Sequence, residues 1–149
     1  RGRACLLLLD LARVPAVCVL WVVVDPAPGT LPAMRVNGVS YRTIWQASDG
    51  AAVEVIDQTL LPHRFETVRL TSLDDAARAI SEMVVRGAPL IGATAAWGMW
   101  LAIRRDPGDD GVEAAAAALI ATRPTAVNLR WAVQRVVADS GTARTGALD

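Results

Sequence analysis

Arg86 opens a short segment whose residue types suit the binding of an anion. The run Arg86-Gly87-Ala88-Pro89 predicts a tight turn that leads directly into a helix. The free N–H groups at a helix start and its positive dipole end favour an anion. Gly87 lets the backbone approach a ligand closely, and Arg86 could add a bidentate contact. The residues alone leave a second interpretation open, in which Gly87 ends the preceding helix and Arg86 is a cation at that helix's carboxyl end.

Arg123 begins a second segment of this kind. Pro124 is expected to open a helix, so Arg123 would lie beside the positive end of that helix. A cation there costs about 0.3–1 kcal/mol unless something negative is nearby. An anionic ligand would remove the conflict, and a solvated surface arginine is the alternative. Two arginines, each at a helix start marked by proline, together predict a bound phosphate.

Other kinds of chemistry are poorly supplied. All 15 basic residues are arginines, so no lysine of this chain can form a Schiff base or act as a general base. His63 is the only histidine, and no metal site is predicted. The sequence shows no nucleophile–base pair and no glycine-rich nucleotide loop. The 15 acidic residues balance the arginines, which argues against non-specific binding to nucleic acid.

The residues before Ser72 predict a small antiparallel sheet. Asn37-Gly38 is a hairpin signal between apolar residues, and residues 48–50 predict a second turn. The expected strands lie on both sides of residues 37–38 and over residues 52–56 and 65–70, with residues 57–62 as a connection.

A helical layer is expected to follow. Ser72 is a good N-cap for a helix that ends at Arg86-Gly87. The next helix begins at Pro89, is apolar nearly all round, and is predicted to be buried and central. Residues 106–110 predict a loop in which Asp109 and Asp110 form a solvated pair. Residues 112–121 predict a helix, and Pro124 predicts the start of another. The helical residues Trp97, Trp100 and Trp131 are assigned to the core.

The predicted fold class is therefore α+β, with a small antiparallel sheet followed by a helical bundle. We expect one domain over residues 34–139 and a truncated tail over residues 140–149.

Residues 1–33 differ in character from the rest. Their apolar runs are shorter than the roughly 20 residues that a membrane-spanning helix needs, so no membrane association is predicted. We expect a non-native extension with Met34 as the true start, and a targeting segment or a native extra element are the alternatives. Cys5 and Cys18 lie in this stretch, and their spacing predicts neither a disulfide framework nor a metal site.

Three segments, in order, resemble the amino-terminal motifs of methylthioribose-1-phosphate isomerases. They are Ile56-Asp57-Gln58-Thr59-Leu60-Leu61-Pro62, Val85-Arg86-Gly87-Ala88-Pro89-Leu90-Ile91-Gly92 and Arg123-Pro124-Thr125-Ala126-Val127-Asn128-Leu129. The resemblance covers the chain from about Met34 to about Ala138. The wider family includes ribose-1,5-bisphosphate isomerases and the regulatory subunits of the eukaryotic initiation-factor guanine-nucleotide exchange factor. The resemblance implies a small sheet plus helices, which form the amino-terminal domain of a two-domain protein whose Rossmann-like second domain is absent from this chain.

The resemblance also implies a function. The family is an aldose–ketose isomerase of methionine salvage that converts 5-methylthioribose 1-phosphate to 5-methylthioribulose 1-phosphate without a metal or cofactor. Arg86, Gly87 and Ala88 would contact the substrate, and Arg123 would bind its phosphate. The family's catalytic cysteine and aspartate belong to the second domain, so this chain would hold no catalytic residue and be inactive alone. The full-length enzyme is expected to be a cytoplasmic homodimer.

Three alternatives stay open. The chain could belong to a regulatory or binding subunit of the exchange-factor type, or to a related ribose-phosphate isomerase. It could also be an envelope-associated helical domain directed by its amino-terminal stretch.

Overall fold

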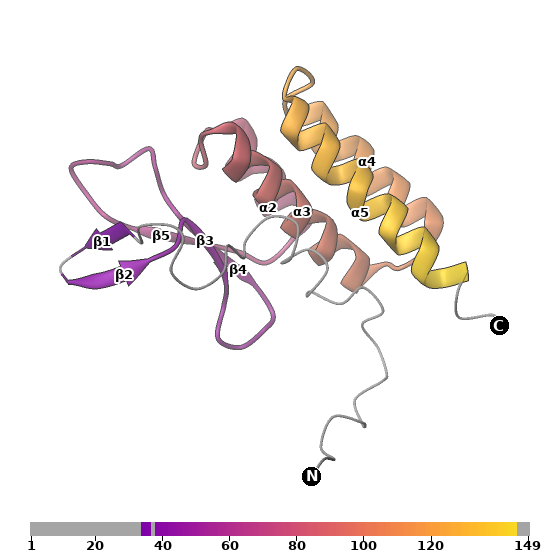
Figure 1. Ribbon diagram of the computed structural model, residues 1–149, viewed down its shortest axis with the longest axis horizontal. Coiled ribbons are helices and arrows are strands. Elements are labelled where there is room, and N and C mark those ends of the chain that lie inside the picture. Colours follow the sequence, from indigo (N-terminus) through magenta and orange to yellow (C-terminus); the bar gives the residue numbers. More distant parts are fainter. Residues whose placement is uncertain (1–33, 37, 146–149) are drawn as a thin grey trace, which may run out of the picture.

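The computed structural model describes residues 34–36 and 38–145. Within these residues, two small antiparallel sheets come first and four helices follow (Figure 1). The fold is therefore α+β, as the sequence predicts. The predictions made for residues 1–33, including Cys5 and Cys18, and for residues 146–149 lie outside the described residues.

The first sheet is a hairpin of β1 (Met34–Val36) and β2 (Val39–Tyr41). Val36 lies opposite Val39, and Gly38 in the turn has φ of +80°, which glycine adopts without strain. The hairpin is thus found where the sequence predicts it. The prediction of a single sheet is wrong, because β2 pairs with β1 whereas the next strand takes its partner from elsewhere.

The second sheet has the order β3 (Ile44–Gln46), β4 (Val53–Ile56) and β5 (Thr67–Leu70). The side chains of the central strand alternate between two environments, since Val53 and Val55 are buried while Glu54 is only half-buried. Glu54 accepts a hydrogen bond of 2.8 Å from the indole N–H of Trp45. One face of this sheet therefore supplies apolar side chains to the helices.

α2 (Leu73–Ser81) begins where the sequence predicts. The hydroxyl oxygen of Ser72 accepts a hydrogen bond of 3.1 Å from the backbone N–H of Asp75, which is the expected N-cap contact. The Asp75 carboxylate in turn accepts hydrogen bonds from the backbone N–H and the hydroxyl of Thr71, at 3.0 and 2.9 Å. Three hydrogen bonds that all involve Asp75 therefore fix the start of this helix.

The predicted end of this helix at Arg86-Gly87 is wrong. The chain leaves the helix after Ser81, because Met83 has φ of +62° and the N–H of Val85 bonds back to the carbonyl of Ala79. Met83 is 43% exposed, whereas Val85 is fully buried.

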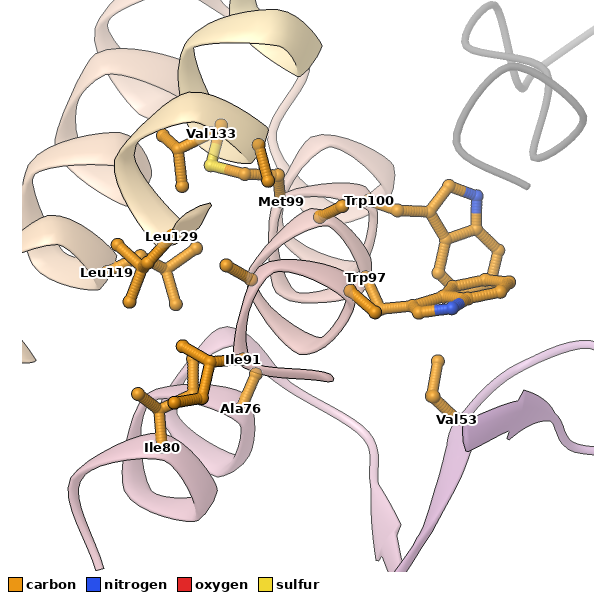
Figure 2. Close-up of a cluster of buried hydrophobic side chains, with 14 of the residues drawn as sticks. Val53, Ala76, Ile80, Ile91, Trp97, Met99, Trp100, Leu119, Leu129 and Val133 are labelled. Atoms are coloured by element: carbon orange, nitrogen blue, oxygen red, sulfur yellow. The ribbon is translucent and has the colours of Figure 1, made fainter. Parts of the chain in front are cut away.

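α3 (Ala88–Arg105) is the buried centre of the fold, as predicted. Every residue from Leu90 to Leu101 is buried. Figure 2 shows Trp97 directed toward Val53 of β4, and Met99 toward Val133 on the opposite side of the helix. A helix that meets neighbours on all sides needs apolar residues all round, which explains its composition.

A hydrogen bond from Arg104, which lies against Trp100, ties the end of α3 to the second sheet. Trp97 and Trp100 meet edge to face, with ring centroids 5.2 Å apart. The Arg104 guanidinium lies 4.6 Å from the centroid of Trp100 and donates a hydrogen bond of 2.8 Å to the carbonyl of Gly50. Gly50 lies in the turn between β3 and β4, so this contact joins helix and sheet.

The last two helices depart from their predicted starts. α4 (Asp109–Thr122) begins at Asp109, so the prediction that Asp109 and Asp110 lie in a loop is wrong. Both lie in the first turn of the helix, where the positive end of the helix dipole favours carboxylates. α5 (Val127–Thr145) begins three residues after Pro124. Among the described helices, none has the combined length and apolar character that crossing a bilayer requires.

The assignment of Trp131 to the core is also wrong, because its side chain is 53% exposed. The buried face of α5 carries Leu129, Val133 and Val136. Since each helical residue turns about 100°, Trp131 lies roughly 200° from Leu129 and points away from the core. Trp97 and Trp100 are buried as predicted.

The cap of α2 predicts an acid-sensitive contribution to stability. Burial opposes ionisation of Asp75, but hydrogen bonds from Thr71 and Ser72 and the nearby Arg78 outweigh it and hold the pKa of the carboxyl below its ordinary value of 3.8. The ionised group therefore stabilises the fold above that value, and the contribution is lost as pH falls through the lowered pKa. Asp75→Asn should lower the melting temperature at pH 7, and the difference from wild type should shrink below about pH 4.

Thermal melts between pH 7 and pH 2.5 measure this effect. Asp74→Asn on the same turn is the control, because Asp74 is exposed and no hydrogen bond to its side chain is found among the described residues. A difference between wild type and Asp75→Asn that stays constant with pH would contradict the assignment.

Candidate functional site

Gly87 begins α3 and is not the end of the helix before it. It is the N-cap residue, with φ of +88°, and Ala88 and Pro89 are the first two helical residues. A Cβ built on Gly87 would meet no protein atom within 4 Å, so the space beside its backbone is open. The N–H groups of Gly87 and Ala88 have no acceptor among the described residues. This turn therefore has the geometry of a helix start that can receive an anion.

The surroundings of Arg86 agree in part with both interpretations of the sequence, the anion site and the cation near the end of the preceding helix. Its side chain is exposed, and its Nε donates a hydrogen bond of 3.2 Å to the carbonyl of Met83, in the turn after α2. The guanidinium thus contacts a carbonyl near the preceding helix, as the alternative interpretation expected. Its two terminal nitrogens have no acceptor within the described part of the chain and remain available to a ligand.

Gln58 is a residue of this site that sequence reasoning missed. Its backbone N–H donates to the carbonyl of Val84 at 3.0 Å, and its side-chain oxygen accepts from the N–H of Arg86 at 3.1 Å. The contacts join the connection after β4 to the turn before α3. The two residues are 28 positions apart, so only the occurrence of Gln58 in the first of the three resembling segments could have signalled it.

Arg123 lies in a different electrostatic setting from the predicted one. It is the C-cap residue of α4, and α5 begins only at Val127, so the predicted conflict with a positive helix end is wrong. A cation at the carboxyl end of α4 is favourable instead. Its side chain is half-buried and has no ion-pair or hydrogen-bond partner among the described residues. Arg42 and Arg105, which also lack partners in that part of the chain, are exposed.

The path of the helices brings the two turns to one end of the molecule. α3 runs in one direction, α4 returns, and α5 runs alongside α3 again, so the turns before α3 and before α5 lie at the same end (Figure 1). Gly92, one turn into α3, packs so closely on α5 that a Cβ there would lie 3.1 Å from the carbonyl oxygen of Asn128. The starts of α3 and α5 are therefore in contact.

The turn that carries Arg123 is itself ordered. The carbonyl of Arg123 accepts a hydrogen bond of 2.9 Å from the N–H of Ala126, and Arg130 donates to the carbonyl of Pro124 at 3.3 Å. Next to it, Val127 is 78% exposed, so the end of the molecule that holds both arginines also presents an apolar side chain. Among the described residues, no group of His, Cys, Asp and Glu side chains is arranged to hold a metal ion.

Comparison with known proteins identifies relatives of this domain. No protein-family model matches the chain. A methylthioribose-1-phosphate isomerase of Methylocella silvestris is 62% identical over 103 residues, which cover 69% of this chain and 28% of the relative. The chain is homologous to the amino-terminal part of methylthioribose-1-phosphate isomerases.

Solved structures agree with this relationship to the isomerases. The 5-methylthioribose 1-phosphate isomerase of Pyrococcus horikoshii matches with a TM-score of 0.59 and 32% identity, over 68% of this chain and 35% of that one. The delta subunit of the translation initiation factor eIF-2B from A. fulgidus matches with the same TM-score and 31% identity, over 70% of this chain and 34% of that one. The chain therefore spans about a third or less of the isomerases it matches.

The contact between Gly92 and Asn128 predicts a coupling between helix packing and the site. Gly92→Ala should force the start of α5 away from α3, because the group it meets is backbone and cannot rotate aside. We expect a stability loss of about 1–3 kcal/mol and weaker binding of inorganic phosphate. Thermal melts and phosphate titration of the folded protein measure the two effects.

Gly98→Ala is the matched control for Gly92→Ala. Its Cβ would lie 2.9 Å from the Cβ of Ala76 and 3.4 Å from Leu119, in the helix interior. This variant should also lose stability but keep the phosphate affinity of wild type. Equal losses of phosphate affinity in both variants would show that the effect is general loosening and not separation of the two turns.

Proposed function

We propose that this chain is the substrate-binding amino-terminal part of an aldose–ketose isomerase that converts 5-methylthioribose 1-phosphate to 5-methylthioribulose 1-phosphate, a step of methionine salvage. In this proposal the turn of Arg86, Gly87 and Ala88 contacts the substrate, and Arg123 binds its phosphate. The substrate is a small sugar phosphate, and the whole protein is a cytoplasmic homodimer. The catalytic residues belong to a part of the isomerases that this chain does not match.

The observation that carries the proposal is the 62% identity over 103 residues to an enzyme of that name. The geometry adds support from an independent direction. The half-buried guanidinium of Arg123 has no partner among the described residues, and a phosphate dianion would accept hydrogen bonds from it. The free N–H groups of Gly87 and Ala88 lie at the same end of the molecule and supply further donors.

The fold does not by itself choose between the isomerase and the exchange-factor subunit, because the two solved structures have the same TM-score. Their sequence identities are also nearly equal, 32% for the isomerase and 31% for the initiation-factor subunit. The isomerase is favoured by sequence relatives of that name, three of which are 60–63% identical to this chain. A regulatory subunit without isomerase chemistry is therefore the less supported function.

The isolated chain should have no isomerase activity. It spans 28% of the length of the isomerase of Methylocella silvestris, and in this proposal the catalytic residues belong to the part that it does not match. Incubation with 5-methylthioribose 1-phosphate, followed by detection of the ketose, tests this expectation. Measurable turnover would show that residues of this chain perform the proton transfer.

The two arginines should carry the binding of the phosphate. Arg86→Ala or Arg123→Ala removes charge-assisted hydrogen bonds of about 1.5–3 kcal/mol, which corresponds to roughly 10- to 100-fold weaker binding of 5-methylthioribose 1-phosphate. Arg→Lys should recover only part of the affinity, because a point charge cannot replace a forked contact. Calorimetric titration of the chain with the sugar phosphate measures both effects.

Stability and a distant variant separate binding from folding. Arg123→Ala should cost about 0.3–1 kcal/mol in the ligand-free protein, since the residue is a cation at the carboxyl end of α4. Arg105→Ala, on the exposed far end of α3, is the control and should bind as wild type does. Near-normal binding by Arg123→Ala, together with a stability loss, would make Arg123 a structural residue.

A further inference from the structure

We propose that Gln58 is a positioning residue, whose side-chain oxygen holds the Arg86–Ala88 turn in the geometry that receives the anion. This inference rests on the proposed function of that turn. It is carried by two hydrogen bonds from one residue, which donates from its backbone to Val84 at 3.0 Å and accepts from the N–H of Arg86 at 3.1 Å.

The turn needs this external acceptor because of how α2 ends. The N–H groups of Glu82, Met83 and Val85 bond back to carbonyls of α2, those of Arg78, Ile80 and Ala79 respectively. The chain then leaves the reach of α2, and α3 begins only at Ala88. Gln58 supplies the acceptor for the first N–H beyond this reach, that of Arg86.

The consequence is a division of donors along the turn. The N–H of Arg86 is bonded to Gln58, and its Nε is bonded to the carbonyl of Met83. The N–H groups of Gly87 and Ala88 and the terminal guanidinium nitrogens of Arg86 have no acceptor among the described residues. Gln58 thus holds the backbone of the turn at Arg86, so that the N–H groups of Gly87 and Ala88 keep a fixed arrangement for a phosphate.

Amide hydrogen exchange on the full 149-residue chain, followed by NMR, reads this hydrogen bond without any ligand. Gln58→Met keeps the side-chain length and removes the acceptor, so the Arg86 N–H should exchange about tenfold faster, within the range that one net hydrogen bond provides. The N–H of Val85 should be unaffected, because its acceptor is the carbonyl of Ala79. Titration with inorganic phosphate should show about three- to tenfold weaker binding.

Two further variants sharpen the test. Gln58→Glu keeps an acceptor oxygen, so it should restore the protection of the Arg86 N–H, yet its negative charge should still weaken phosphate binding. Gln134→Met is the matched control, because the side chain of Gln134 is exposed on α5 and has no hydrogen-bond partner among the described residues. It should leave both the exchange rate of the Arg86 N–H and the phosphate affinity unchanged.

The outcomes are distinguishable. Unchanged exchange at Arg86 in Gln58→Met would overturn the proposal, and so would a lower melting temperature with unchanged phosphate affinity, which a merely structural role predicts. Failure of the proposed function looks different. In that case the wild-type chain binds no phosphate, although exchange of the Arg86 N–H still responds to Gln58→Met. The positioning role of Gln58 is then also wrong, because there is no anion site for it to position.

Discussion

The burial of α3 on all sides is the constraint on which the rest of the structure depends. Its residues from Leu90 to Leu101 contribute to contacts with the second sheet and with the other three described helices, α2, α4 and α5. A fully buried large apolar side chain contributes about 1.5–3 kcal/mol relative to an exposed one, and α3 supplies Trp97, Met99 and Ile91 to the core that its neighbours share. Because each neighbour buries its apolar face against this one helix, none has an independent core of its own.

The candidate site takes its geometry from the amino end of the same helix. Gly87 begins α3 with an open backbone, and Gly92 lets the start of α5 come into contact one turn later. The connection after β4 reaches the site through Gln58, and α4 ends there with Arg123. Three distant parts of the sequence therefore lie at the same end of α3, which explains why the resembling segments are separated along the chain.

Local signals in the sequence predicted the elements whose cause is local. Ser72 caps α2 and Gly38 forms the hairpin turn because each satisfies a requirement of its own neighbours. The end of α2 could not be predicted, because Met83 adopts a φ that its residue type does not favour, held by the bond from Val85 to Ala79. The start of α5 could not be predicted from Pro124, because proline suits a turn as well as a helix start. Trp131 lies on a helix as its spacing predicted, but on the exposed face and not on the face that packs against the core. The contact of Gln58 with Arg86 is tertiary and leaves no periodic pattern. Arg86, Gly87, Ala88 and Arg123 were named from the sequence, and their contact with a substrate stays a prediction.

The tryptophans on the helices lie in contrasting surroundings, which makes the chain an optical reporter of its own state. Trp131 is accessible to a collisional quencher in water, whereas Trp97 is shielded by the core. The edge-to-face pair of Trp97 and Trp100 holds two indoles at a fixed angle, an arrangement that gives a near-ultraviolet circular dichroism signal only while side-chain packing persists. Loss of packing around Trp97 and Trp100 can thus be followed in this chain without any attached dye.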